Sequence, residues 1–189
     1  MRYNGFWILM LALLLAASVV PARANLIADP GFESCVNLGF TPPSWTATTS
    51  GECDSNPHTG NWDADFSHAA STLSQTITTV TGDNYDFSFW LEVLPVSPDF
   101  FTASFGSNEV LDVVNVSGFV GYTLEDFTVT ATGTSTTVAF SGETNHGGWI
   151  LDDVSVTDQG PSAPEPASLV LLGSGLLGIA WRFRHRRTH

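Results

Sequence analysis

The sequence predicts an all-β fold, a single β-sandwich of the jelly-roll type, from three observations. Hydrophobic and polar residues alternate with a period of two in several segments between residues 73 and 157, which is the pattern of half-buried strands. Glycine-containing turn sequences separate these segments, and none of them shows a helical stripe. Roughly seven to nine short strands in one domain are typical of a β-sandwich, although the periodicity alone does not separate a jelly roll from an immunoglobulin topology.

The clearest of the expected strands covers residues 85–93. Its hydrophobic members, which alternate with polar residues and with Trp90, are Tyr85, Phe87, Phe89, Leu91 and Val93. Further strands are expected at residues 73–77, 101–105, 127–131, 136–141 and 149–157. Residues 61–70 are instead rich in turn-forming residues. The sandwich is therefore expected to span residues 25–158, followed by a short linker at residues 159–163.

Residues 1–24 have the composition of a signal peptide. Met1-Arg2 supplies a positive start, Phe6–Val20 a hydrophobic core, and Ala22-Arg23-Ala24 a small-x-small cleavage site. We therefore expect export and a mature chain that begins at Asn25. The alternative is an uncleaved N-terminal membrane anchor.

The C-terminal segment, residues 164–189, combines three elements. Pro164-Glu165-Pro166 is followed by a hydrophobic run without charge, Ala167–Trp181, and then by a cluster rich in arginine. The run predicts a transmembrane helix at about residues 166–183, slightly short of the roughly 20 residues that span a bilayer. The arginines would remain on the cytoplasmic side. A buried core helix is the alternative, but core helices rarely end in four arginines.

Charge separates the body from the two ends. All six basic residues lie in the terminal segments, whereas residues 25–163 hold 18 of the 19 acids and no Lys or Arg. Nucleic acid and anionic membrane surfaces are therefore excluded as partners of the body, because both require basic residues. Disorder is the alternative for so acidic a segment, but its many Phe, Trp, Val and Leu residues favour a packed core.

The body contains two cysteines, Cys35 and Cys53. In an exported protein such a pair predicts a disulfide, and a loop of this size would contribute about 3 kcal/mol by the chain-entropy estimate. Two free buried thiols are the alternative. A cysteine metal site is less favoured, because no second CxxC sequence or nearby histidine accompanies the pair.

No catalytic signature stands out in the body. Its three histidines are His58, His68 and His146, and the first two flank the acidic sequence Asp63-Ala64-Asp65. Their spacing matches no metal-site motif, and a Gly-x-Ser-x-Gly nucleophile sequence is absent. We therefore interpret the histidines as surface loop residues and the protein as a non-enzyme.

The C-terminal segment resembles the PEP-CTERM sorting tail of exported proteins of Gram-negative bacteria. The residues that carry this resemblance are Pro164, Glu165, Pro166, Arg182, Arg184, Arg186 and Arg187. The resemblance implies recognition by an exosortase, a membrane protease-transpeptidase, with cleavage near the Pro-Glu-Pro sequence. It also implies anchoring in the inner membrane before processing, then a place at the cell surface or in the extracellular matrix, and an association with exopolysaccharide.

The body resembles the galactose-binding-like jelly rolls found among carbohydrate-binding modules. The matching sequences are Gly31-Phe32-Glu33, Leu73–Ile77, Tyr85–Trp90 and Gly148–Val156. The resemblance implies that the first and last strands lie together and that a structural calcium ion binds where they meet. Calcium prefers carboxylate and carbonyl oxygens, and its side-chain ligands would be Glu33 and Asp152.

Two alternatives to this calcium site remain open. Glu33 and Asp152 can instead accept hydrogen bonds from nearby turns and backbone amides. Asp63-Ala64-Asp65 is a weaker candidate for calcium and is more often a solvated loop. Asp153 is expected to point to the opposite face from Asp152 if the last strand is regular.

Tryptophans are the candidate carbohydrate contacts, because their rings stack on pyranose C–H groups. Trp62 lies in a polar sequence, and Trp90 alternates with the hydrophobic face of its strand, where it could share a concave sheet with Gln75. Trp45 and Trp149 are assigned to the core, which is the alternative for the other two as well. The two functional hypotheses are a non-catalytic structural protein of the cell surface and a displayed carbohydrate-binding module.

Overall fold

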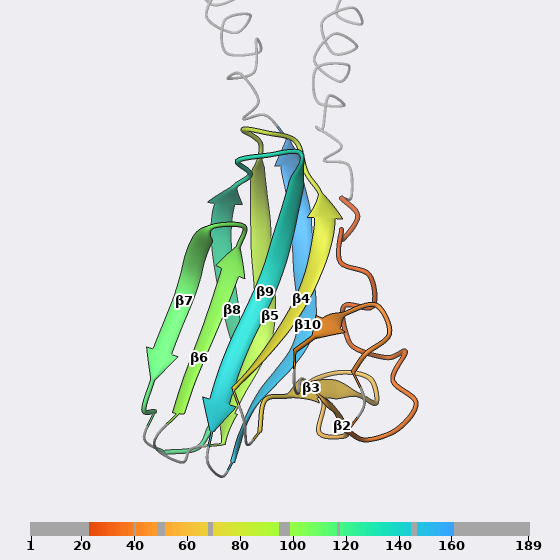
Figure 1. Cartoon of the computed structure of the whole chain (residues 1–189), viewed down its shortest axis with the longest axis vertical. Helices are drawn as coiled ribbons and strands as arrows, with labels where there is room; N and C mark the ends of the chain where they lie inside the picture. Colours follow the sequence, from red (N-terminus) through yellow and green to blue (C-terminus); the bar gives the residue numbers. More distant parts are fainter. Residues whose placement is uncertain are drawn as a thin grey trace, which may run out of the picture.

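The computed structural model describes residues 23–39, 41–48, 52–67, 70–94, 99–116, 118–144 and 147–160. These residues form two antiparallel five-stranded sheets, and no helix occurs among them (Figure 1). The predicted all-β sandwich is therefore confirmed. The described part of the chain contains no helix long and apolar enough to span a bilayer. The predicted signal peptide, up to Pro21-Ala22, and the tail at 164–189 lie outside the described residues.

Each sheet mixes strands that are distant in sequence. One sheet has the order β1-β4-β9-β6-β7, with bounds Thr46–Ala47, Ser71–Thr78, Ser135–Thr144, Asp99–Phe105 and Asn108–Val114. The other has the order β2-β3-β10-β5-β8, with bounds Glu52–Asp54, Asp63–Asp65, Gly148–Gly160, Asn84–Leu94 and Val120–Thr130. We call them the β4–β9 sheet and the β5–β10 sheet. The expected strands at residues 73–77, 85–93, 101–105 and 149–157 are confirmed and are longer than expected.

The core between the sheets is built largely from phenylalanines. The alternation in β5 turns Phe87 and Phe89 inward, where both are completely buried. Phe89 meets Phe140 of the opposite sheet edge to face, with ring centroids 5.1 Å apart. Edge-to-face pairs of this kind add roughly 1 kcal/mol each beyond the area that they bury. The period-two pattern of the sequence thus corresponds to the inner faces of the sandwich.

The residues that follow the predicted signal peptide pair with the last strand. Asn25 pairs with Thr157, and the Leu26 amide donates a hydrogen bond to the Val156 carbonyl at 2.8 Å. The Asn25 side chain also donates to the Val154 carbonyl and accepts from the Val156 amide. The two ends of the body therefore lie side by side, as the resemblance implied.

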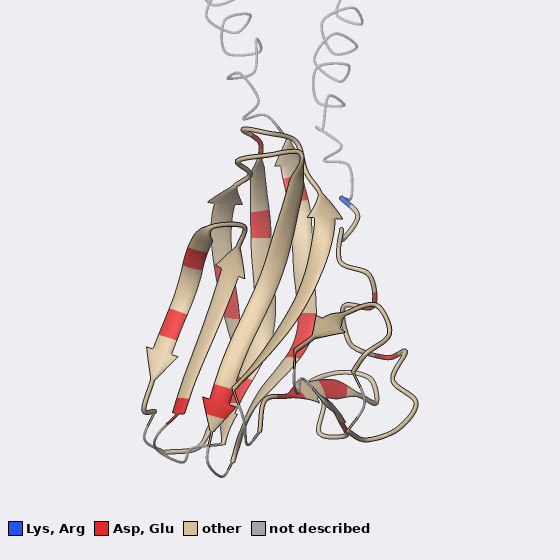
Figure 2. Ribbon diagram, in the orientation of Figure 1, with Lys and Arg blue, Asp and Glu red and all other residues tan. Residues whose placement is uncertain are grey.

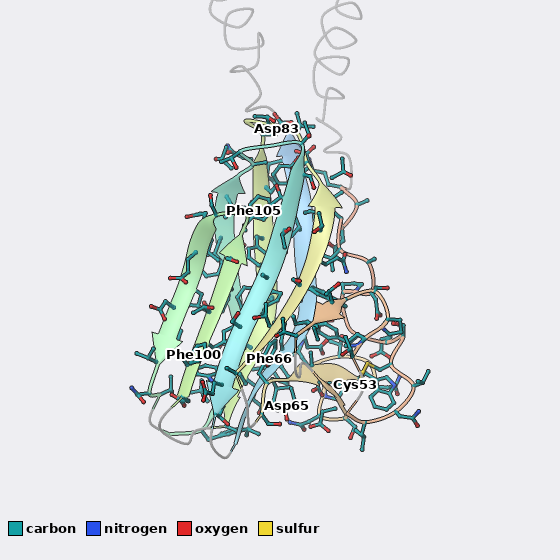
Figure 3. The ribbon with its side chains drawn as sticks, viewed as in Figure 1. Cys53, Asp65, Phe66, Asp83, Phe100 and Phe105 are labelled. Carbon is teal, nitrogen blue, oxygen red and sulfur yellow. A yellow bond between two sulfur atoms is a disulfide. The ribbon has the colours of Figure 1, made fainter. Side chains whose placement is uncertain are left out.

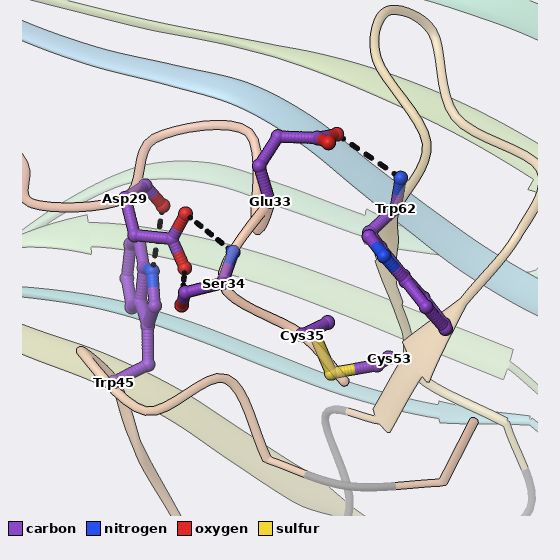
Figure 4. Close-up of a disulfide and its surroundings, with 7 residues drawn as sticks. All are labelled: Asp29, Glu33, Ser34, Cys35, Trp45, Cys53 and Trp62. Carbon is purple, nitrogen blue, oxygen red and sulfur yellow. Dashed lines mark hydrogen bonds between the residues drawn. A yellow bond between two sulfur atoms is a disulfide. The ribbon is translucent and has the colours of Figure 1, made fainter. Parts of the chain in front are cut away.

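A disulfide joins Cys35 to Cys53, with a Cα–Cα distance of 6.0 Å (Figure 4). It links the irregular N-terminal segment, which carries Glu33, to β2. Both predicted core tryptophans are buried, Trp45 at 5% exposed and Trp149 at 1%. The Trp45 indole N–H donates to the Asp29 carbonyl at 3.2 Å, which holds the same segment on the core.

Candidate functional site

The candidate site is the loop Ser55–Trp62, which lies over outward-facing side chains of the β5–β10 sheet. We call it the acid-clasped loop, because most of the side chains outside the loop that it contacts by hydrogen bonds in the described structure are carboxylates. These carboxylates belong to Glu33, Asp63, Glu92, Asp152 and Asp153.

Backbone amides of the loop make the first set of contacts. The Asn56 amide donates to Asp63 Oδ2 at 2.6 Å, and the Thr59 amide donates to Asp152 Oδ2 at 2.9 Å. Glu33 Oε1 accepts from the Asn61 amide at 2.7 Å. It also accepts from the Trp62 amide at 3.1 Å, which Figure 4 shows as a dashed line. Hydrogen bonds to ionised acceptors are roughly twice as strong as neutral ones, so the two contacts with Glu33, whose pKa is lowered by them, do most to fix the path of the loop.

Side chains of the loop make a second set. Asn56 Nδ2 donates to Glu92 Oε2 at 3.0 Å, and His58 Nδ1 lies 2.8 Å from Asp153 Oδ2. The Thr59 hydroxyl donates to Asp153 Oδ1 at 2.8 Å. The loop is thereby tied to β5 and to β10 as well as to its own flank.

One glycine lets the loop approach Glu33. Gly60 has a φ of +77°, and a Cβ atom at this position would lie 2.1 Å from Glu33 Oε1. A side chain would therefore be strained by the backbone conformation and would also collide with the carboxylate.

An irregularity in β10 brings two adjacent acids to the same loop. The pairing of β10 with β5 shifts between Asp152 and Ser155, and Asp153 has a φ of +50°. Asp152 and Asp153 consequently both contact Thr59. The expectation that Asp153 points to the opposite face is wrong, because it assumed a regular strand and the strand contains a β-bulge.

Asp63-Ala64-Asp65 is also not a solvated loop. It is strand β3, paired with β2 on one side and β10 on the other, and both Asp63 and Ala64 are completely buried. The strand was not predicted from the sequence, because two of its three residues are aspartates, which are uncommon in strands.

Burial makes this part of the site electrostatically unusual. Desolvation raises the pKa of Asp63 to about 7, with the charges of Asp54, Asp152 and Asp65 adding to the rise and the Asn56 amide opposing it. Desolvation likewise raises the pKa of Asp152 to about 6 and raises that of Glu92. Asp63 Oδ1 is buried without a hydrogen-bond partner.

Glu33 differs from these buried acids. Its carboxylate lies nearer to solvent, and although desolvation raises its pKa, the hydrogen bonds from Asn61 and Trp62 outweigh that effect and lower it. Residues 25–160 contain no Lys or Arg, so the five carboxylates of the clasp are held by N–H donors and by His58 rather than by cationic side chains.

An aromatic group lies beside the clasp. The His58 ring stacks on Trp90 with centroids 3.9 Å apart and an interplanar angle of 15°. Tyr122 of β8 tilts against His58 at 5.2 Å, and its hydroxyl donates to the Asn56 carbonyl at 3.0 Å. Leu124, which is 52% exposed, pairs with Trp90 in the sheet register and continues this surface.

The structure separates the three residues expected to bind carbohydrate. Trp90 is on β5 and Gln75 is on β4, in different sheets, so they do not share a concave surface. The Gln75 amide instead bonds Ala28 and the Ser44 carbonyl and holds the N-terminal segment. Trp62 is partly buried and packs against the core. Only Trp90 lies in the aromatic group, and His58 covers its ring.

The predicted calcium ligands do lie near one another. A Cβ atom added at Gly31 would be 3.6 Å from Asp152 Oδ1 and 3.9 Å from Glu33 Cγ. Five N–H bonds already use these two carboxylates, which leaves about three lone-pair sites, whereas calcium takes six to eight oxygens. In the described part of the chain no three or more His, Cys, Asp or Glu residues are arranged to hold a metal. The hydrogen-bonding alternative is therefore present, and calcium binding stays a prediction.

Sequence reasoning did not assign four residues to this site: His58 as the cover of Trp90, the buried acids Asp63 and Glu92, and the half-buried Tyr122. Glu92 carried a usable signal, because it is two residues from Trp90 and thus on the same face of the strand. The predicted sorting residues, together with His68 and His146, lie outside the described residues.

Comparison with known proteins gives matches for the C-terminal segment and, among solved structures, for the sandwich. Residues 162–187 match the PEP-CTERM protein-sorting motif. The chain matches no curated protein sequence. The motif indicates an exported protein that is sorted by an exosortase.

Solved structures with the same fold include a carbohydrate-binding module, TmCBM61, in complex with β-1,4-galactotriose. It is 20% identical, with a TM-score of 0.54, and the match covers 72% of this chain and 99% of that one. A Stig cyclase from Fischerella sp. TAU is 15% identical with a TM-score of 0.52, covering 73% of this chain and 98% of the cyclase. An adhesin domain of Lys-gingipain from Porphyromonas gingivalis is 16% identical with a TM-score of 0.51, covering 72% and 99%. The chain thus carries a PEP-CTERM sorting motif behind a β-sandwich with the fold of carbohydrate-binding modules.

Proposed function

We propose that this protein is a non-catalytic component of a polysaccharide-containing cell surface or extracellular matrix, delivered there by an exosortase. The observation that supports this proposal most is the sorting motif at residues 162–187, which directly follows the last strand of a compact acidic sandwich. A body with 18 acids and no Lys or Arg stays soluble and self-repelling outside the cell. The fold is shared by binding modules and by a cyclase, so the non-catalytic role is part of the proposal.

Fractionation of producing cells tests it. The processed protein should co-sediment with matrix polysaccharide, be released when that polysaccharide is digested, and liberate no reducing ends from it. A matched control replaces Arg182, Arg184, Arg186 and Arg187 by Gln, and this variant should stay with the cells. A processed protein that ignores the polysaccharide, or that hydrolyses it, contradicts the proposal.

The second candidate function is a displayed carbohydrate-binding module, and the aromatic group favours it. Trp90 and Tyr122 lie beside Asn56, Thr59 and Asp153, a mixture of rings and hydrogen-bonding groups that suits a sugar. His58 stacks on Trp90 where a pyranose would stack. A sugar that uses Trp90 must therefore displace the imidazole, and His58 would set the affinity of the site.

Binding of β-1,4-galactotriose and of matrix polysaccharide to the processed protein tests this second function. His58→Ala should increase the affinity and Trp90→Ala should abolish binding. Trp62→Phe, which leaves the aromatic group intact, serves as the control. Absence of binding by the parent protein and by His58→Ala would exclude the carbohydrate-binding function.

A structural calcium ion at Glu33 and Asp152 remains a proposal of its own. The two carboxylates would hold the ion with backbone carbonyls, and the ion would neutralise charge that no Lys or Arg now balances. Calcium at 100 times its Kd would stabilise the folded state by about 2.7 kcal/mol. Thermal unfolding with calcium and with EGTA measures this, and Glu33→Gln with Asp152→Asn should remove the difference. An equal melting temperature in both conditions would exclude the ion.

A further inference from the structure

The sorting motif is attached very close to the folded sandwich. Strand β10 ends at Gly160, and the motif begins at residue 162. The three residues at 161–163 let the chain reach at most about 14 Å from Gly160 to Pro164. The 13 residues of β10 alone span about 43 Å. Cleavage near Pro164, which the resemblance implies, would therefore take place within about a third of the sandwich's length from its surface.

Two turns form the surface at this end, and we call them the double turn. They are the β4–β5 connection, residues 79–83, and the β8–β9 connection, residues 131–134. Gly160 pairs with Asn84, which pairs with Thr130, so the end of β10 lies beside both turns. Figure 3 labels Asp83 at this end and Phe100 toward the opposite end.

Hydrogen bonds join the two turns of the double turn to each other. The Gly82 amide donates to the Ala131 carbonyl at 2.8 Å, and the Ala131 amide donates back to the Asp83 carbonyl at 3.0 Å. The Thr79 hydroxyl donates to the Gly133 carbonyl at 2.8 Å. The turns are thus preorganised, which reduces the entropy that binding a partner would cost.

The double turn presents an exposed apolar side chain and acidic charge. Val80 is 55% exposed, and Asp83 stands three residues later. The nearest described basic group, Arg23, lies 3.6 Å from Asp158 but belongs to the predicted signal peptide and is expected to be removed with it. An anionic lipid surface needs basic residues, so this surface suits a protein partner rather than the membrane.

We propose that the double turn is the surface on which the folded sandwich contacts the exosortase while the tail is cleaved. The inference rests on the exosortase sorting proposed above. With about 14 Å of chain between body and cleavage site, an enzyme that grips the peptide on both sides of the bond touches the end of the sandwich. Exposed Val80 then contacts the enzyme, and the charge of Asp83 disfavours contact between this end of the sandwich and anionic lipid.

Processing of the full chain in exosortase-containing cells tests this. Val80→Arg should lower the rate of tail removal about fivefold, equivalent to roughly 1 kcal/mol, because the short connection forces the long charged side chain against the enzyme. The matched control is Val114→Arg, since Val114 is 59% exposed and pairs with Phe100 at the far end. That control should be processed like the parent. A flexible linker of about 12 Gly and Ser residues after Gly160 adds about 19 Å of reach and should restore processing of Val80→Arg.

Each other outcome is informative. Processing of Val80→Arg at the parental rate overturns the inference, and so does a defect that the linker fails to rescue. Faster processing with more membrane association would assign the surface to lipid instead. If Val80→Arg does not fold, as judged by its thermal unfolding, Thr132→Arg in the other exposed turn takes its place. If the parent protein and every variant all keep the tail, exosortase sorting itself is contradicted.

Discussion

Two regions of the sandwich satisfy their polar groups in different ways: the carboxylates beneath the acid-clasped loop, which we call the acidic face, and the outward side of β4 and β9, which we call the hydroxyl face. On the β5–β10 sheet, Asp63 and Asp152 are completely buried and depend on amides of the acid-clasped loop. On the β4–β9 sheet, the outward positions between Thr72 and Thr78 and between Ser135 and Ser141 carry mainly hydroxyls and no charge. Figure 2 shows β4 without acidic residues, whereas β3 and β10 carry them.

The difference has an energetic consequence. Hydroxyls satisfy one another across strands, as Thr76 Oγ1 and Thr137 Oγ1 do at 3.0 Å, without a change of charge. A buried carboxylate must either keep its proton or be held by donors, and Asp63 Oδ1 has none. The contribution of the acidic face to stability should therefore depend on pH and on loop geometry. The contribution of the hydroxyl face should depend on neither.

The largest expected effect is that of pH on the free energy of unfolding. The raised pKa values of Asp63, about 7, and Asp152, about 6, mean that the folded protein keeps protons that the unfolded chain has lost. Above the ordinary Asp pKa of 3.8, the free energy of unfolding should therefore fall as the pH rises toward 7, by on the order of a few kcal/mol. Thermal unfolding at pH 5 and pH 8 in EGTA measures this, and Asp63→Asn should flatten the dependence. A melting temperature at pH 8 equal to or above that at pH 5 would contradict the account.

Removal of the disulfide should come next. Cys35 and Cys53 are 18 residues apart, and the chain-entropy estimate for such a loop is about 3 kcal/mol. Replacing both residues by Ser should lower the melting temperature by roughly 10 °C. Because the bridge holds the segment that carries Glu33, hydrogen exchange should accelerate in the acid-clasped loop and not in β4. Equal acceleration in both regions would show that the bridge acts on the whole domain.

A glycine substitution probes the loop more locally. Gly60→Ala places a side chain at a φ of +77° and against Glu33, so it should cost about 2 kcal/mol. Gly118→Ala, with a φ of +97° and no atom within 4 Å of the added Cβ, is the matched control for backbone strain alone. Denaturant unfolding compares the two. A smaller loss for Gly60→Ala than for Gly118→Ala would mean that the Glu33 contact does not hold the loop.

The smallest effect is expected on the hydroxyl face. The double variant Thr76→Val with Thr137→Val removes both partners of one exposed hydroxyl pair and should change the free energy of unfolding by less than about 0.5 kcal/mol. Its pH dependence should match that of the parent protein. A larger loss, or an altered pH dependence, would remove the contrast between the faces.

The fold followed from the sequence where side-chain alternation was strong. Phe87 and Phe89 in β5, and Phe101 with Ala103 in β6, turn inward as the period of two requires. Strand β3 escaped prediction because a three-residue strand of sequence Asp-Ala-Asp has no periodicity to detect. The length of a strand and its burial are set by its partners, which lie far away in the sequence.

The candidate site was less predictable for the same reason. The contact of His58 with Trp90 joins residues 32 apart in sequence, and the assignment of Gln75 and Trp90 to different sheets depends on strand order. Glu33 and Asp152 could be grouped only through a family resemblance. Asp153 points toward Thr59 because of the β-bulge, and no feature of the sequence predicts that bulge.

The intact mass of the processed protein tests the central claim most directly. It should be measured from cells with and without an exosortase. We predict a chain that begins at Asn25 in both, and that has lost the residues beyond about Pro164 only where the enzyme is present. A mass that retains the complete tail in both kinds of cell would contradict the account.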